Sequence, residues 1–203
     1  KTILVLGSGP IKIGQAAEFD FSGSQAVRAL REDGYEVILV NSNPATIQND
    51  PEMADIVYIE PLLPDTVRRI LEIERPCALL AGMGGQTALN IASELAHDGS
   101  LERLGVELIG SDLDAIDKAE DRELFNQVCK SINLPISNAI ACNTMDGVIA
   151  AAESIGTWPI LIRPAFTLGG LGGGTAWDLG QLVEIATLGL RNSRINQVLI
   201  EES

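Results

Sequence analysis

The first 110 residues alternate between short, fully apolar runs and longer amphipathic stretches. An apolar run of four or five residues is typical of a strand buried on both faces, and a helix after each strand is typical of a parallel sheet. The pattern predicts strands at Ile3–Leu6, Val37–Val40, Ile56–Ile59, Ala78–Ala81 and Glu107–Ile109, and helices at Gln15–Glu32, Leu62–Glu74 and Thr87–Ala96. We therefore expect an α/β fold whose first part is an open, Rossmann-like, doubly wound unit that ends near Gly110.

The pattern changes after Gly110. A charged stretch, Asp112–Ser131, predicts one long helix, and the order that follows is strand, helix, strand, strand, helix, strand. The expected strands are Ala139–Cys142, Ile160–Ile162, Thr175–Trp177 and Val198–Glu201, and the expected helices are Met145–Ile155 and Leu179–Leu190. This order predicts a small α+β layer, distinct from the first unit.

The sequence stops within its last expected strand, at Ser203, with no turn after it. We interpret the chain as truncated. The missing strands should then leave Val198–Glu201 as an unprotected sheet edge, prone to association.

A glycine-rich loop lies between two of the expected strands. Five of the six residues from Gly169 to Gly174 are glycine. Because glycine costs backbone entropy and forgoes packing, such a run indicates close backbone approach to a ligand, with N–H groups turned toward anionic oxygens. Arg163, six residues before the first glycine, adds a fixed positive charge suited to phosphate. We interpret the loop as a nucleoside triphosphate site; a flexible hairpin tip is the alternative.

Other glycine-containing turns are less specific. Gly7–Gly9 follows the first strand but lacks the third glycine and the acidic residue of a dinucleotide-binding fingerprint. Gly9–Ala16 has the glycine spacing of a Walker A loop without its Lys-Ser/Thr pair. Gly84–Thr87 is either a binding loop or a tight turn capped by its threonine. The polar segments Glu18–Asp20 and Asn41–Asp50 are either solvated connections or interdomain contacts.

Composition excludes several classes of function. A formal net charge of −14 disfavours nucleic acid as a partner, and no apolar run approaches the length that spans a membrane. The three cysteines, Cys77, Cys129 and Cys142, are too far apart for a metal-ligand motif, and their odd number favours a reducing, cytoplasmic location. With His97 as its single histidine, which we expect to be a solvated helix residue, the chain is a poor candidate for a zinc site.

Seven blocks of sequence together resemble the large chain of carbamoyl phosphate synthetase, and the resemblance runs across essentially the whole chain. The blocks are Gly7–Gln15, Glu18–Gly23, Val40–Thr46, Asp50–Asp55, Met83–Asn90, Asp117–Arg122 and Arg163–Gly170. Asn43–Thr46, Gln86–Asn90 and the glycine run resemble the first, carboxyphosphate-forming half of that family. The Glu18–Gly23 and Asn41–Thr46 blocks argue against a biotin carboxylase.

The resemblance implies a domain organisation and a set of site residues. It implies a pre-ATP-grasp domain over residues 1–110, a helical linker over 111–132 and a partial ATP-grasp domain, its N-terminal lobe, over 133–203. In the family, the arginines that match Arg122 and Arg163 contact nucleotide phosphates, the glycines that match Gly169 and Gly170 lie over the triphosphate, and the glutamate that matches Glu202 belongs to the adenosine pocket. Arg163 is also the expected catalytic residue, and the metal ligands are expected beyond residue 203.

The implied enzyme is an ATP-dependent ligase, glutamine-hydrolysing or ammonia-dependent. It phosphorylates bicarbonate to carboxyphosphate on the way to carbamoyl phosphate, for arginine and pyrimidine biosynthesis. The implied cofactors are ATP with Mg²⁺ or Mn²⁺, and potassium is a further candidate ion. The implied partners are bicarbonate, a glutamine amidotransferase small subunit and the second half of the same large chain.

We expect the isolated fragment to be inactive. The alternatives are another ATP-grasp carboxylate–amine ligase, a biotin-carboxylase-like enzyme, and a regulatory half that binds nucleotide without turnover.

Overall fold

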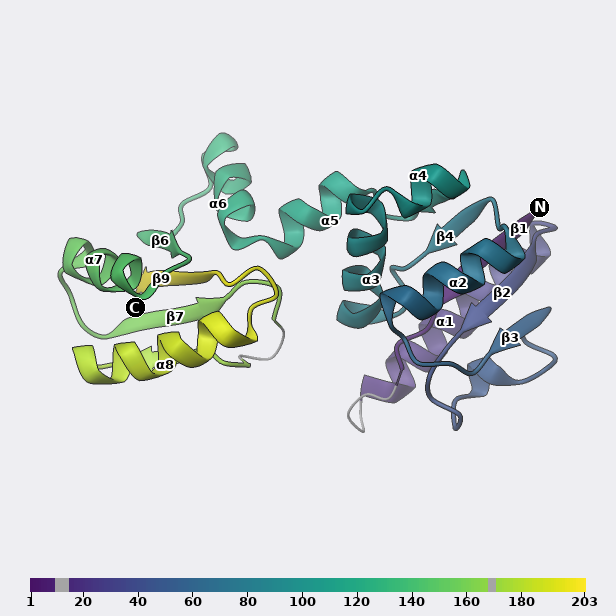
Figure 1. Ribbon diagram of the computed structural model, residues 1–203, viewed down its shortest axis with the longest axis horizontal. Coiled ribbons are helices and arrows are strands. Elements are labelled where there is room, and N and C mark those ends of the chain that lie inside the picture. Colours follow the sequence, from purple (N-terminus) through teal and green to yellow (C-terminus); the bar gives the residue numbers. More distant parts are fainter. Residues whose placement is uncertain (10–14, 168–170) are drawn as a thin grey trace. The chain divides into compact units, whose positions relative to one another are not determined.

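The computed structural model describes residues 1–9, 15–167 and 171–203 (Figure 1), without the side chains of Gln15, Ala16 and Arg122. The chain forms two compact units, Lys1–Ile116 and Asp117–Ser203. The division falls within the helix α5 (Leu113–Glu120).

The first unit is built on a parallel sheet with the strand order β3-β2-β1-β4-β5. Its strands are β1 (Thr2–Leu6), β2 (Glu36–Val40), β3 (Ile56–Tyr58), β4 (Ala78–Leu80) and β5 (Glu107–Ile109). Its helices are α1 (Gln15–Glu32), the 3₁₀ helix η1 (Ile47–Asn49), α2 (Pro64–Glu74), α3 (Gly85–His97) and α4 (Ser100–Leu104). The expected doubly wound, Rossmann-like unit is confirmed.

Both faces of this sheet are buried. Leu4 and Leu6 of β1 share one apolar cluster with α2 and α3, whereas Ile3 and Val5 share another with Val27 of α1. Successive side chains of a strand point to opposite faces, so a strand covered on both sides must be apolar at every position. This is why the short apolar runs predicted these strands.

The second unit is an antiparallel sheet with the strand order β6-β9-β7-β8. Its strands are β6 (Ala139–Cys142), β7 (Ile160–Pro164), β8 (Gly174–Ala176) and β9 (Val198–Glu202), and its helices are α6 (Arg122–Ser131), α7 (Met145–Ile155) and α8 (Leu179–Asn192). One apolar cluster joins Ile160 and Ile162 of β7 and Val198 and Ile200 of β9 to the helices α7 and α8. The expected α+β layer is confirmed.

The expectation of an unprotected edge at Val198–Glu201 is wrong. β9 pairs with β6 on one side and with β7 on the other, so its backbone groups are used in both directions. The order of pairing depends on contacts between residues far apart in sequence, which a pattern of apolar residues does not reveal.

The single long helix expected over Asp112–Ser131 is also wrong. The chain forms α5 and α6 instead, and Asp121 between them is extended, with φ −83° and ψ 118°. Its carboxylate accepts hydrogen bonds from the backbone N–H groups of Glu123 and Leu124, at 2.8 and 2.9 Å. A side chain that caps a new helix in this way ends the preceding one.

The two polar segments that follow β1 and β2 bind each other within the first unit. The hydroxyl of Thr46 donates to the carboxylate of Asp20 at 2.6 Å, and the buried amide of Gln48 donates to the carbonyl of Phe19 at 3.0 Å. A Cβ at Gly23 would lie 2.6 Å from the amide oxygen of Gln48. Glycine at this position therefore lets α1 approach η1 closely.

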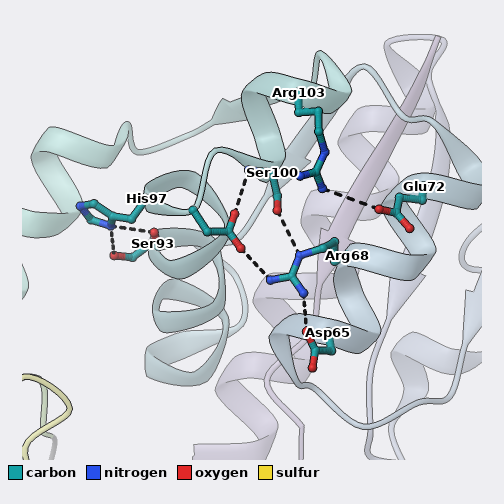
Figure 2. A network of polar contacts seen from close by, with 8 residues as sticks. Asp65, Arg68, Glu72, Ser93, His97, Ser100 and Arg103 are labelled. Atoms are coloured by element: carbon teal, nitrogen blue, oxygen red, sulfur yellow. Dashed lines mark hydrogen bonds and ion pairs between the residues drawn. The ribbon is translucent and has the colours of Figure 1, made fainter.

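A polar network joins α2, α3 and α4 (Figure 2). The guanidinium of Arg68 donates to the carboxylate of Asp98 at 2.6 Å, to the hydroxyl of Ser100 at 3.0 Å and to Asp65. α4 was not expected from the sequence; it begins where the Asp98 carboxylate accepts from the N–H of Ser100 at 2.8 Å. Hydrogen bonds from Ser100, followed by those from Arg68, lower the pKa of the Asp98 carboxyl below its ordinary value.

His97 is exposed at the end of α3, as expected. Its Nδ1 lies 2.8 Å from the carbonyl oxygen of Ser93 on the preceding turn (Figure 2).

The lowered pKa of Asp98 predicts a stability change in acid. A carboxyl whose folded pKa lies below its unfolded pKa stabilises the fold above about pH 4 and loses that contribution as the pH falls through the folded value. Asp98→Asn should therefore lower the free energy of unfolding at pH 7, and the difference from wild type should shrink below about pH 4. Urea unfolding at both pH values measures this. Asp33→Asn is the control, because Asp33 is exposed and lies outside this network; an Asp98→Asn deficit that does not change between pH 7 and pH 3 would contradict the expectation.

The cap at Asp121 predicts a second stability effect. Asp121→Ala removes the one side-chain oxygen that accepts two hydrogen bonds from the first turn of α6, and should destabilise the second unit by about 1 kcal/mol. Asp121→Asn keeps a capping oxygen and should retain most of the stability. Thermal unfolding of the two variants distinguishes them; equal melting temperatures for both would show that the cap is unimportant.

Candidate functional site

The sheet of the second unit has one polar face. In the β7–β9 register Arg163 pairs with Leu199, and Leu161 pairs with Glu201. Because Ile162 and Ile200 turn toward α7 and α8, the alternation of side chains places Arg163 and Glu201 together on the opposite face. The fold of the unit thus brings a cation and an anion together on neighbouring strands.

Arg163 and Glu201 form an ion pair. The Nη1 of Arg163 lies 3.3 Å from the Oε2 of Glu201, and the Arg163 side chain is 45% exposed whereas that of Glu201 is only 12% exposed. The other carboxylate oxygen, Oε1, accepts a hydrogen bond from the hydroxyl of Ser137. The carboxylate is therefore held from two sides, while the guanidinium extends toward solvent.

These residues line a pocket of about 410 Å³ within the second unit. Phe125 and Asn126 of α6 and Leu199 contribute to its wall. The remaining lining residues are Ala119, Pro135, Ile136, Ser137, Arg163 and Glu201. The pocket combines an aromatic ring, an amide and a partly exposed guanidinium, which suits a planar, anionic ligand.

The glycine loop begins and ends at fixed points. Phe166 is left-handed, with φ 56°, and the guanidinium of Arg194 lies 5.2 Å from the centre of its ring. The hydroxyl of Thr167 donates to the carbonyl of Pro164 at 3.1 Å. At the other end Gly172 has φ 71°, and a Cβ there would lie 2.8 Å from the side chain of Asn192 on α8. Gly172 is thus required by the fold, whatever the loop binds.

Of the site residues expected from the sequence, Arg163 lines this pocket. Gly169 and Gly170 lie outside the described residues, and so does the side chain of Arg122, which is the first residue of α6. Glu202 follows Glu201 on β9, and its carboxylate accepts from the N–H of Asn138 at 3.0 Å. Glu202 is not among the described residues that line the Arg163 pocket.

Sequence reasoning missed Glu201 and Ser137. Glu201 is buried between two apolar-rich strands, where a carboxylate is unusual unless it is paired. A glutamate directly after the apolar run Val198–Ile200 is the sequence signal that could have found it, but its partner depends on the register of β7 against β9. Ser137 precedes β6 and has no distinguishing sequence context.

The carboxyl ends of β1, β2 and β3 border a separate pocket in the first unit, of about 480 Å³. Ser8, Ser42 and Thr87 line it. Thr87 does not cap α3, because the helix begins one turn earlier, after Gly84, and has no side-chain cap. A Cβ at Gly84 would lie 2.5 Å from the carbonyl oxygen of Gly7. Gly84 therefore allows close packing of the start of α3 against the end of β1.

The described residues contain neither a helix that could span a membrane nor a cluster of metal-ligating side chains. No helix in that part of the chain is both long and apolar enough to cross a membrane. No group of three or more histidine, cysteine, aspartate or glutamate side chains there could hold a metal ion.

Two family models match the chain, one for each unit. Residues 1–118 match the carbamoyl phosphate synthase preATP-grasp domain. Residues 121–203 match the ATP binding domain of the carbamoyl-phosphate synthase L chain.

Curated relatives match over the whole chain. The carbamoyl phosphate synthase large chain of Archaeoglobus fulgidus is 58% identical over 202 residues, which is 100% of this chain and 19% of the relative. The large chain of Methanothrix thermoacetophila is 55% identical over 203 residues, with the same two shares. The arginine-specific, chloroplastic large chain of Arabidopsis thaliana is 56% identical over 100% of this chain and 17% of its own length. The chain thus spans about one fifth of the length of these relatives.

Solved structures with lower identity share the fold. The biotin carboxylase domain of 2-oxoglutarate carboxylase from Hydrogenobacter thermophilus, solved with MgADP, ADP and bicarbonate, aligns with a TM-score of 0.69 at 16% identity, over 100% of this chain and 44% of that one. D-alanine–D-alanine ligase from Bacillus anthracis aligns with a TM-score of 0.59 at 16% identity, over 99% of this chain and 56% of that one. Both are similar in fold alone, whereas the family models and the curated relatives agree on one family. The chain belongs to the carbamoyl phosphate synthase large-chain family.

Proposed function

We propose that the chain is the opening part of the carboxyphosphate-forming half of a carbamoyl phosphate synthase large chain. Its role would be to bind ATP for the phosphorylation of bicarbonate. The observation that supports this most directly is the partly exposed Arg163, which lines a pocket in the unit that matches the family's ATP binding domain. The expected domains, residues 1–110, 111–132 and 133–203, belong to the same proposal.

The proposed reaction has two steps. A bicarbonate oxygen attacks the γ-phosphorus of ATP, so that an O–P bond forms, the bond to the β-phosphate oxygen breaks and ADP leaves. Ammonia then attacks the carbonyl carbon of carboxyphosphate, phosphate leaves and a proton is released, which gives carbamate. A second phosphorylation would give carbamoyl phosphate, the carbamoyl donor for arginine and pyrimidine biosynthesis.

The residues of this chain would act by position and charge. Arg163 would neutralise charge on the phosphates during transfer, where a planar guanidinium binds two oxygens at once. Arg122 begins α6, the helix that contributes Phe125 and Asn126 to the pocket, and is proposed to contact phosphate as well. Gly169 and Gly170 would cover the triphosphate and keep water from an unstable mixed anhydride. Glu202 is proposed to belong to the adenosine pocket.

The described residues provide no metal site of their own. A divalent ion that arrives with ATP would neutralise phosphate charge, and it would not depend on the described residues of this chain for its ligands. Mg²⁺ or Mn²⁺ in that role, and a requirement for potassium, are proposed from the resemblance alone.

The partners are proposed in the same way. Ammonia would come from a glutamine amidotransferase small subunit, and carbamate would pass to the second half of the same large chain. A cytoplasmic location is proposed from the cysteine content, although the Arabidopsis relative is called chloroplastic. The proposal is tested in the full-length protein by bicarbonate-dependent ATP hydrolysis and by carbamoyl phosphate formation from ammonia. Absence of both would overturn it.

A second candidate function is a regulatory half that binds nucleotide without turnover. The pocket and Arg163 would serve nucleotide binding alone equally well. ATP binding without bicarbonate-dependent hydrolysis would favour this candidate.

Arg163→Ala in the full-length protein should reduce bicarbonate-dependent ATP hydrolysis by about 100-fold, the usual cost of removing one group that stabilises transition-state charge. Arg163→Lys should restore only part of the rate, because lysine lacks the planar fork. Steady-state kinetics and thermal unfolding are measured together. Arg191→Ala is the matched control, because Arg191 is exposed at the end of α8. If a stably folded Arg163→Ala variant turns over at the wild-type rate, Arg163 has a structural role and no catalytic one.

Gly170→Val tests the glycine loop. A left-handed backbone, or close approach to phosphate, would make a Cβ cost about 1–2 kcal/mol, so the KM for ATP should rise about tenfold. The stability of the first unit should not change. Gly180→Val is the control, because Gly180 is exposed on α8. A hairpin tip with no ligand would tolerate valine, and equal rates at limiting ATP would reject a phosphate-covering role.

A further inference from the structure

We propose that Glu201 is a positioning residue for the nucleotide site: it holds the guanidinium of Arg163 in the pocket, and Ser137 holds Glu201. The role rests on the proposed function, in which Arg163 contacts phosphate. It concerns a residue that neither the glycine loop nor the family resemblance singled out.

The contacts of the Glu201 carboxylate carry the proposal. One oxygen faces the Nη1 of Arg163 at 3.3 Å, and the other accepts the hydroxyl hydrogen of Ser137. With its side chain 12% exposed, Glu201 has little water to replace either partner. A carboxylate that is largely shielded from water is stable only while both oxygens keep their hydrogen bonds. The Glu201 carboxylate therefore holds the side chains of Arg163 and Ser137 in place.

Glu201 is held rigidly because its strand, β9, lies between two other strands of the sheet. Glu201 pairs with Ala139 of β6 and with Leu161 of β7, so its backbone is held on both sides. Arg163 is a long side chain with many rotamers. Without the ion pair, ordering of this side chain on ligand binding would cost conformational entropy. An ion pair to a rigid strand removes part of that cost before binding.

The pair leaves most of the guanidinium available. Among the residues that the structure describes, only the Nη1 of Arg163 is hydrogen-bonded to a side chain, which leaves Nε and Nη2 for a ligand. These two nitrogens lie on one edge of the guanidinium plane, the edge that binds two oxygens of a phosphate. Glu201 would therefore direct that edge without occupying it.

A carboxylate near a phosphate site also repels the ligand. Orientation of Arg163 and repulsion of phosphate have opposite effects on affinity, so the sign of a Glu201 substitution distinguishes them. If orientation is the larger effect, loss of the carboxylate weakens binding; if repulsion is larger, loss strengthens it. We expect orientation to be larger, because the Glu201 charge is already balanced by Arg163 and screened from the ligand by it.

The test is a double-mutant cycle in the full-length protein, with ADP as the probe and calorimetry as the measurement. Glu201→Ala should raise the Kd for ADP about tenfold, the loss expected for one hydrogen bond to a charged group. Glu201→Gln keeps an oxygen for Arg163 and should have a smaller effect. Glu201→Ala in an Arg163→Ala background should have no further effect, because the two residues act as one unit. Glu184→Ala, at an exposed position of α8, is the control.

Each outcome decides the proposal. A Kd for Glu201→Ala that is unchanged or lower, or that rises equally in the Arg163→Ala background, overturns the positioning role; the equal rise would show a purely structural one. A coupled pair in a protein without bicarbonate-dependent hydrolysis would leave the positioning role standing and reject the proposed reaction. Failure of the wild-type protein to bind ADP would reject both.

Discussion

Successive side chains of a β-strand point to opposite faces, and both sheets of this protein are organised by that alternation. In the parallel sheet of the first unit both faces are covered, so Ile3 and Val5 must be as apolar as Leu4 and Leu6. In the antiparallel sheet of the second unit only one face is covered by α7 and α8, and the other can carry charge. The candidate site exists because of this difference.

The positions of Arg163 and Glu201 in the second unit depend on the apolar face that α7 and α8 cover. Burial of Ile162 and Ile200 fixes which side chains of β7 and β9 face the core. The alternate positions then face away from it, and this places Arg163 beside Glu201. A slip of one residue in either strand would bury the guanidinium or the carboxylate among aliphatic side chains, at a high cost in free energy. The apolar core therefore determines the geometry of the site without containing any part of it.

Much of the fold could be predicted from the sequence, because the apolar runs of β1, β2 and β4 are local features. The break at Asp121 could not, since a run of charged residues suits a continuous helix and only the backbone angles show that the aspartate is a cap. Arg163 could be predicted as a site residue from its distance to the glycine run. Its partner Glu201 could not, because the pairing of β7 with β9 joins segments about 40 residues apart, and nothing local encodes that register.

The central place of β9 has a consequence for how the chain folds during synthesis. The described strands of the first unit's sheet all lie within residues 2–109, so they leave the ribosome before those of the second unit. Among the described strands of the second unit, β6 pairs only with β9, which comes last of them in the sequence. The pairing of β6 and β7 with β9 must wait for residues 198–202 and requires closure of a long loop, which is slow. Until then the apolar faces of α7 and α8 lack the cover that β9 provides, and this exposed apolar surface is one to which a chaperone could bind.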